Sequence, residues 1–110
     1  MSAAVLRAPF PYFGGKRRAA SLVWEALGNV DHYVEPFAGS AAVLLARPHA
    51  GRCETINDLD GMVSNFWRAV RSQPDAVAEA CDWPVLECDL HARHLWLIGQ
   101  RESLTARLIA

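Results

Sequence analysis

The stretch DHYVEPFAGSAAVLLARP (residues 31–48) decides the fold of the first half of this chain. Its first part, residues 32–37, predicts a short buried strand that ends at Pro36, because tyrosine, valine and phenylalanine favour strands and proline interrupts their pairing. Gly39 then begins a turn, and Ser40 is a residue type that caps helices. The run AAVLLA predicts a helix that Pro48 closes. The stretch therefore predicts a strand, a glycine turn and a helix in succession.

The flanking segments extend this pattern to an α/β fold. A helix is expected from Lys16 to Gly28, a second strand over residues 53–58, and a helix capped by Asp58 or Asp60. Two further helices are expected over residues 74–81 and from Asp89 onward. Two strands joined by a helix should pair in parallel. A sheet of only two strands leaves both edges unpaired, so we expect something else to complete it.

The composition is that of one small globular domain. Apolar residues make up 52% of the 110 residues and charged residues 21%, and the net charge is −1. No apolar run approaches the ~18 residues of a membrane span and no signal-peptide layout is present, which predicts a cytoplasmic protein. The near-zero charge argues against capture of nucleic acid by the chain as a whole.

The positive charges are unevenly placed. Residues 1–20 contain four of the 11 lysines and arginines and none of the 12 acidic residues. Lys16, Arg17 and Arg18 are expected in the first turn of a helix, where the helix dipole disfavours cations. This placement suggests an anionic partner such as a ligand carboxylate or a DNA phosphate, although solvated surface charge is the commoner explanation. Tyr12 would add an aromatic face beside an adenine or a sulfonium.

A metal site and disulfide bonds are not expected. Cys81 and Cys88 lie close to His91 and His94, which raises the alternative of a zinc site. The gap between the two cysteines is longer than in a zinc knuckle and contains a rigid Trp-Pro pair. Three cysteines are also too few for a disulfide framework.

The glycine turn itself points to a nucleotide-like cofactor. Backbone N–H groups at a helix start favour anionic groups, and Gly39 lets the main chain approach a ligand closely. Asp58 follows 19 residues later at the end of the next strand, where nucleotide-binding folds place an acid that holds ribose hydroxyls. The alternative is that Asp58 only caps the next helix. Ala41 occupies the second glycine position of the dinucleotide motif, so that motif is absent.

Three segments in this order, YFGGK, VEPFAGS and NDLDGMVSNFWRAV, resemble the amino-terminal part of Dam-like DNA adenine methyltransferases. These enzymes use S-adenosyl-L-methionine and are common in restriction-modification systems and phages. The resemblance covers residues 9–71 and extends through residues 82–97. It implies that residues 1–110 are the cofactor-binding part of an incomplete Rossmann-like methyltransferase domain, apparently truncated, with short parallel strands and several helices.

The resemblance also implies a set of site residues. Cofactor-binding roles fall on Tyr12, Lys16, Glu35, Pro36, Phe37, Gly39, Ser40 and Asp58. DNA-binding roles fall on Lys16, Arg17 and Arg18, and double-stranded DNA is the partner of the complete enzyme. Ala41 departs from the glycine that many members carry, and its methyl group would either crowd the ligand or fill space left by a smaller neighbour.

The acceptor side of the reaction is missing from the sequence. The family uses an Asp-Pro-Pro-Tyr-type tetrapeptide to hold the flipped adenine, but neither Asp-Pro-Pro nor Asn-Pro-Pro occurs here. We therefore expect no catalytic residue in this chain, inactivity of the chain alone, and a complementary catalytic segment as a partner. The alternatives are a non-catalytic DNA- or cofactor-binding remnant or accessory module and, less favoured, a methyltransferase for small molecules.

Overall fold

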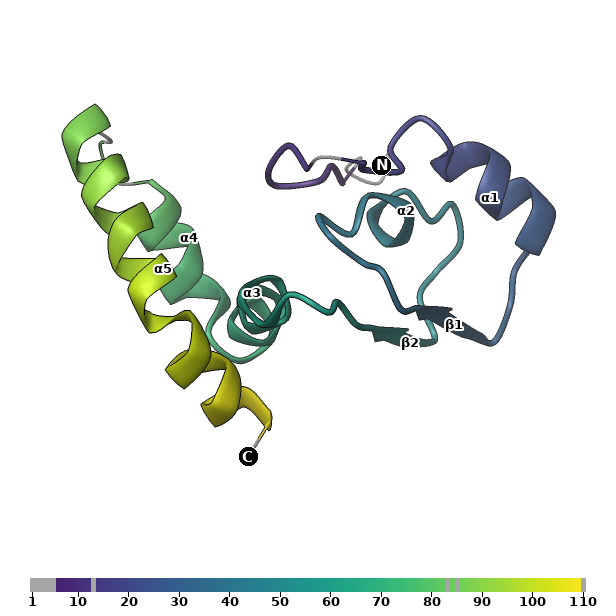
Figure 1. The fold of residues 1–110 in the computed structure, drawn as a ribbon. Coiled ribbons are helices and arrows are strands. Elements are labelled where there is room, and N and C mark those ends of the chain that lie inside the picture. The colour runs from purple at the N-terminus through teal and green to yellow at the C-terminus, as the bar shows by residue number, and fades with distance from the viewer. Residues whose placement is uncertain (1–5, 13, 83, 85, 110) are drawn as a thin grey trace. The chain divides into compact units, whose positions relative to one another are not determined.

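The computed structural model describes residues 6–12, 14–82, 84 and 86–109, with side chains as far as residue 103. Its elements follow the predicted order α, β, α, β, α, α, α (Figure 1). The chain divides into two compact units, Met1–Leu59 and Asp60–Ala110. The strands and the glycine turn belong to the first unit, and the second unit is helical.

The sheet of the first unit is a parallel pair, as predicted. Strand β1 (His32–Glu35) pairs with strand β2 (Cys53–Ile56), with His32 opposite Cys53 and Glu35 opposite Ile56. Burial alternates along β1: Tyr33 and Glu35 are buried, whereas Val34 is 57% exposed. The predicted buried strand is therefore buried at alternate residues rather than along its whole length.

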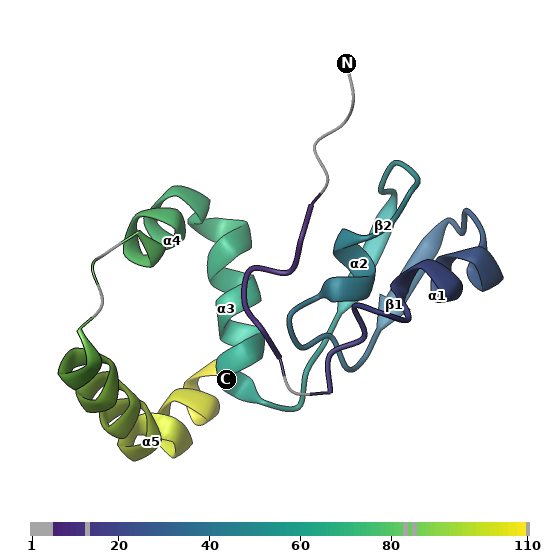
Figure 2. The same ribbon diagram turned by 90° about the horizontal axis from the view of Figure 1, so that it is seen from above.

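Helices α1 (Ala20–Leu27) and α2 (Ala42–Leu45) cover one face of the sheet (Figures 1 and 2). The core contains Ala20 and Trp24 of α1, Tyr33 of β1 and Val43 of α2. The indole N–H of Trp24 donates a hydrogen bond of 2.6 Å to the backbone oxygen of Val43, which satisfies a buried donor and fixes α2 against α1. The short helix that follows the glycine turn is thus held by tertiary contacts.

Arg47 ties the end of α2 to its surroundings. Its guanidinium lies 5.0 Å from the ring centre of Trp24, donates to the Val30 oxygen at 2.7 Å, and pairs with Glu54 of β2 at 3.2 Å. Its side chain is only 4% exposed. Because a guanidinium has several donors in a fixed plane, one residue can connect α1, β2 and the loop before β1.

Two helix starts differ from the sequence-based expectation. Helix α1 begins at Ala20 rather than at Lys16, so the three cations precede the helix instead of lying in its first turn. Ser40 does not cap α2, because the N-cap is Ala41, which has a left-handed backbone (φ +56°) and makes no side-chain cap. Gly28 ends α1 as predicted, with φ +71°.

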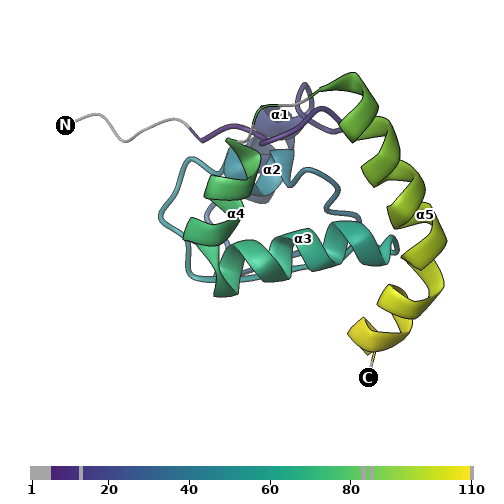
Figure 3. The same cartoon turned by 90° about the vertical axis from the view of Figure 1, so that its left-hand side faces the viewer.

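The second unit consists of helices α3 (Gly61–Ser72), α4 (Pro74–Cys81) and α5 (Glu87–Ile109). Helix α3 contacts both of the others (Figure 3). Asp60 caps α3 by accepting from the Met62 N–H at 2.9 Å. Large aromatic residues are expected in a protein core, but Trp96 of α5 is 60% exposed.

The described residues contain neither a candidate membrane span nor a metal-binding cluster. Among the described residues, each helix falls short of the length or apolar character needed to cross a membrane. The same part of the chain contains no group of three or more His, Cys, Asp and Glu side chains placed to hold a metal ion. All three cysteines are exposed and free.

Candidate functional site

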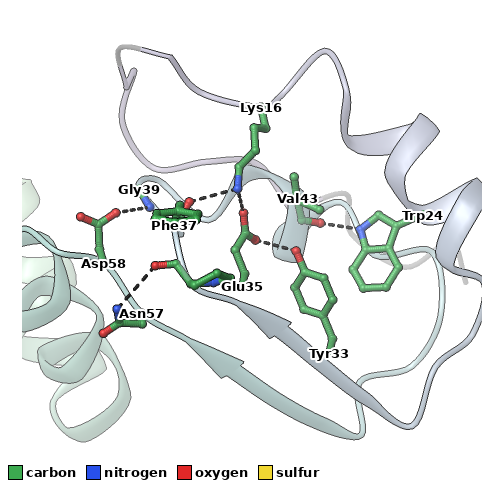
Figure 4. A network of polar contacts seen from close by, with 10 residues as sticks. Lys16, Trp24, Tyr33, Glu35, Phe37, Gly39, Val43, Asn57 and Asp58 are labelled. Atoms are coloured by element: carbon green, nitrogen blue, oxygen red, sulfur yellow. Dashed lines mark hydrogen bonds and ion pairs between the residues drawn. The ribbon is translucent and has the colours of Figure 1, made fainter.

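All the predicted site residues lie in the first unit, which also contains the two paired strands. The Asp58 carboxylate, just beyond β2, accepts a hydrogen bond of 2.9 Å from the backbone N–H of Gly39, just beyond β1 (Figure 4). Asp60 rather than Asp58 caps α3. The alternative in which Asp58 is only the helix cap is therefore wrong.

Backbone hydrogen bonds hold the same loop against β2. The N–H of Ala38 donates to the Asn57 oxygen, and the N–H of Asn57 donates to the Glu35 oxygen, both at 2.8 Å. The parallel pairing thus continues past the last residues of the strands. As a result Gly39 and Asp58 occupy fixed neighbouring positions at the carboxyl edge of the sheet.

The segment that precedes α1 is called the amino-terminal arm here. A buried carboxylate connects it to this edge of the sheet. Glu35 is 3% exposed and forms an ion pair with the ammonium group of Lys16 through Oε1 (Figure 4). Its other oxygen accepts from the Tyr33 hydroxyl at 2.6 Å. Lys16 also donates to the Phe37 backbone oxygen at 3.0 Å. The structure therefore brings together two predicted site residues, Lys16 and Glu35, and they form an ion pair with each other.

Tyr33 is a member of this network that the sequence analysis did not identify. Burial, followed by the hydrogen bond and the negative charge of Glu35, raises the pKa of the Tyr33 hydroxyl above its ordinary value. The hydroxyl therefore remains a donor and fixes the carboxylate. The sequence does contain a pattern that indicates this contact: Tyr33 and Glu35 are two positions apart on a strand, so their side chains face the same side.

Tyr12 packs directly on Gly39. A Cβ atom at Gly39 would lie 2.7 Å from Cδ1 and from Cε1 of the Tyr12 ring, and the Gly39 backbone is left-handed with φ +52°. Both features require glycine. The group that approaches the Gly39 backbone in this structure is accordingly the ring of Tyr12, which brings the arm over the turn.

Ala41 also has a left-handed backbone, although it is not a glycine. Its φ of +56° is strained for any residue with a Cβ, while its side chain is completely buried. Its methyl group therefore occupies space in the interior of the unit.

The remaining predicted residues differ in exposure. Ser40 is buried at 4% exposure, Pro36 is exposed, and Phe37 is 74% exposed. Arg17 and Arg18 are both exposed, in contrast to Lys16, whose side chain is 42% exposed. Of the three cations, Lys16 alone is drawn into the network around Glu35.

A cavity of about 420 Å³ lies beside the turn. This volume is within the ~300–1,000 Å³ range of small-molecule sites. Its lining combines aromatic, aliphatic and polar residues and includes Pro9, Phe10, Tyr12, Arg17, Ser40 and Ala42. Lys16, Gly39 and Asp58 are not part of that lining, but Tyr12, which lines the cavity, also packs on Gly39.

A comparison with protein families identifies the chain. The family described as D12 class N6 adenine-specific DNA methyltransferase matches residues 12–86, which is more than half of the 110 residues. The match includes the arm from Tyr12, the glycine turn and Asp58. No curated protein and no solved structure gives a significant match. The chain belongs to the D12 class N6 adenine-specific DNA methyltransferase family.

Proposed function

We propose that this chain is the S-adenosyl-L-methionine-binding part of an adenine-specific DNA methyltransferase and that it is inactive alone. In this proposal residues 1–110 are one part of a Rossmann-like methyltransferase domain. The adenine-specific DNA methyltransferase activity is proposed from the family to which the chain belongs. The observation that carries the cofactor assignment is the hydrogen bond from Gly39 to Asp58, which sets an acid beside a glycine turn at the carboxyl edge of a parallel sheet.

The described residues are chemically suited to this cofactor. A carboxylate such as that of Asp58 accepts hydrogen bonds from ribose hydroxyls, and its hydrogen bond with Gly39 restricts its rotation. The Tyr12 ring offers an aromatic face to an adenine or to the positive sulfonium. When bound, the cofactor supplies an activated methyl group on that sulfonium. The role of this chain is to hold and orient that donor, which lowers the barrier by proximity and alignment.

Glu35 and Lys16 have supporting roles in this proposal. Because both oxygens of Glu35 are engaged, its carboxylate holds the arm in place rather than contacting the cofactor. Lys16 in turn fixes the Phe37 carbonyl and so the path of the loop. Ser40, which lines the cavity, is the loop residue whose hydroxyl is best placed to meet a ligand there.

We assign the residues that hold the target adenine, which accepts the methyl group, to another segment. The 110 residues contain no Asp-Pro-Pro or Asn-Pro-Pro sequence to hold a flipped adenine. The proposal therefore expects double-stranded DNA to be a partner of the assembled enzyme, with a complementary catalytic segment supplying the tetrapeptide. The groups proposed to meet DNA phosphate are Lys16, Arg17 and Arg18, of which the two arginines are exposed and Lys16 is paired with Glu35.

Calorimetry tests the cofactor assignment. S-adenosyl-L-methionine should bind the chain with one-to-one stoichiometry, and Asp58→Ala should weaken binding at least about 10-fold, as expected for loss of a hydrogen-bonded charged group. Asp60→Ala is the matched control, since it removes an acid two residues away that caps α3 and pairs with Arg101. Salt-sensitive DNA binding without any cofactor affinity would instead support a non-catalytic DNA-binding module.

A methyl-transfer assay tests the inactivity. The chain alone should transfer no methyl group from S-adenosyl-L-methionine to unmethylated DNA. Transfer should appear when a family segment that carries the missing tetrapeptide is added. Transfer by the chain alone would refute the assignment of the acceptor chemistry to another segment.

A further inference from the structure

We propose that Arg17, rather than Lys16, is the residue that binds the α-carboxylate of the amino-acid moiety of the cofactor. This inference rests on the proposed function and adds to it a residue that selects for one end of the ligand. It is carried by two independent observations. One is the position of Arg17 in the wall of the cavity, and the other is the engagement of Lys16 elsewhere.

The charge of Lys16 is already balanced inside the protein. Its ammonium group pairs with Glu35, which is 3% exposed, and it also donates to the Phe37 oxygen. Withdrawing Lys16 to meet a ligand would leave a buried carboxylate without its counter-charge, which is strongly unfavourable. The Lys16–Glu35 pair therefore contributes little net charge toward a bound anion.

Arg17 is free of this constraint. It is exposed, and within the described part of the chain it forms no ion pair. Among the described residues that line the cavity, Arg17 alone carries a charge. A guanidinium binds a carboxylate through two parallel hydrogen bonds, a geometry that an ammonium group cannot provide.

The rest of the cavity offers aromatic faces and a hydroxyl group beside Arg17. Phe10 and Tyr12 form an edge-to-face aromatic pair with ring centres 6.2 Å apart, and both line the cavity. Ser40 adds a hydroxyl that can donate to a carboxylate oxygen. An adenosine joined to an amino acid through a sulfonium has both the aromatic part and the terminal carboxylate that this lining requires.

The test compares two ligands on the unaltered chain and on single-residue variants. S-adenosyl-L-methionine and decarboxylated S-adenosyl-methionine differ by the carboxylate and keep the same sulfonium, amine and adenosine. Their affinities are measured by calorimetry for the unaltered chain, for Arg17→Gln and for Arg18→Gln. Arg18 is the matched control, because it is the neighbouring exposed arginine and does not line the cavity.

The unaltered chain should prefer the carboxylated ligand about 10-fold or more, as charge-assisted hydrogen bonds imply. Arg17→Gln should reduce this preference to about twofold or less, and Arg18→Gln should preserve it. A preference that survives in Arg17→Gln, or an equal loss of affinity for both ligands, would overturn the inference. A preference lost only in Lys16→Met would overturn it as well and would assign the carboxylate to Lys16.

The outcomes also separate this inference from the proposed function. If neither ligand binds the unaltered, folded chain, the proposed cofactor site itself is wrong and the assignment of Arg17 is wrong with it. If both ligands bind and Asp58→Ala abolishes both, while Arg17→Gln leaves their ratio unchanged, the cofactor site stands and only the role of Arg17 is refuted.

Discussion

The backbone N–H of Gly39 donates a hydrogen bond of 2.9 Å to the carboxylate of Asp58, and these residues are separated by 19 positions in the sequence. This contact joins the loop after β1 to the end of β2. The Tyr12 ring also packs on Gly39, and this packing brings the amino-terminal arm to the same edge of the sheet.

The contact between Asp58 and Gly39 should stabilise the loop measurably. Asp58→Ala removes an acceptor from a buried backbone N–H, so we expect a loss of about 1–2 kcal/mol in the free energy of unfolding and faster hydrogen exchange of the Gly39 amide. Asp60→Ala should cost about 1 kcal/mol through the lost helix cap without accelerating that amide. Unchanged exchange at Gly39 in Asp58→Ala would contradict the contact.

Gly39→Ala should destabilise the first unit more than Gly14→Ala does. Both glycines have a positive φ, which costs an alanine about 1–2 kcal/mol, but only at Gly39 does the new Cβ meet the Tyr12 ring. Urea unfolding measures both variants. Adding Tyr12→Ala to Gly39→Ala should recover the steric part of the loss. Equal costs at the two glycines would show that Tyr12 does not pack on Gly39.

Ala41→Gly should be less destabilising than Ala42→Gly by about 1 kcal/mol or more. Both substitutions remove a buried methyl group, but the first relieves a left-handed backbone whereas the second places glycine in helix α2. Thermal unfolding of the two variants gives the comparison. The same loss for both would argue against the strained geometry of Ala41.

The stability of the chain should fall above about pH 10 because of Tyr33. Its pKa is raised on folding by burial and by Glu35, so above the ordinary tyrosine pKa of about 10 the unfolded chain loses this proton before the folded chain does. The unfolded state is then favoured as the pH rises, whereas no such effect operates below that range. Urea unfolding between pH 8 and pH 11 should show the decline.

Two variants isolate the contribution of Tyr33. Tyr33→Phe should flatten the decline at high pH and should also cost about 1–2 kcal/mol at neutral pH, because the buried Glu35 carboxylate loses a donor. Tyr12→Phe is the control, since it alters the other tyrosine of the chain and should leave the decline in place. A decline that persists in Tyr33→Phe would contradict the assignment.

The order of the elements was predictable because each carries a local signal. The spacing of apolar residues and the proline at its start predicted helix α4 with the bounds that the structure has, and the connection through a helix predicted the parallel pairing of the strands. The position of Asp58 after β2 followed from the same reasoning. These features depend on short-range sequence patterns or on simple rules of connection.

Other features depend on contacts between distant residues and were not predictable in this way. Ser40 looks like a helix cap, but the left-handed backbone of Ala41 moves the helix start beyond it. Lys16 looks like part of a solvated cluster, but a buried carboxylate 19 residues away engages it. Trp96 lies in an amphipathic pattern that favours burial, and the described helices leave it exposed.

The most direct test of the cofactor site is an amide NMR titration of the 110-residue chain with S-adenosyl-homocysteine, the product form of the proposed cofactor. The account predicts saturable shifts of the amides of Gly39, Ser40 and Asp58, with helix α4 unaffected as an internal control. The absence of shifts at saturating ligand in a folded sample, or shifts confined to the helical unit, would contradict it.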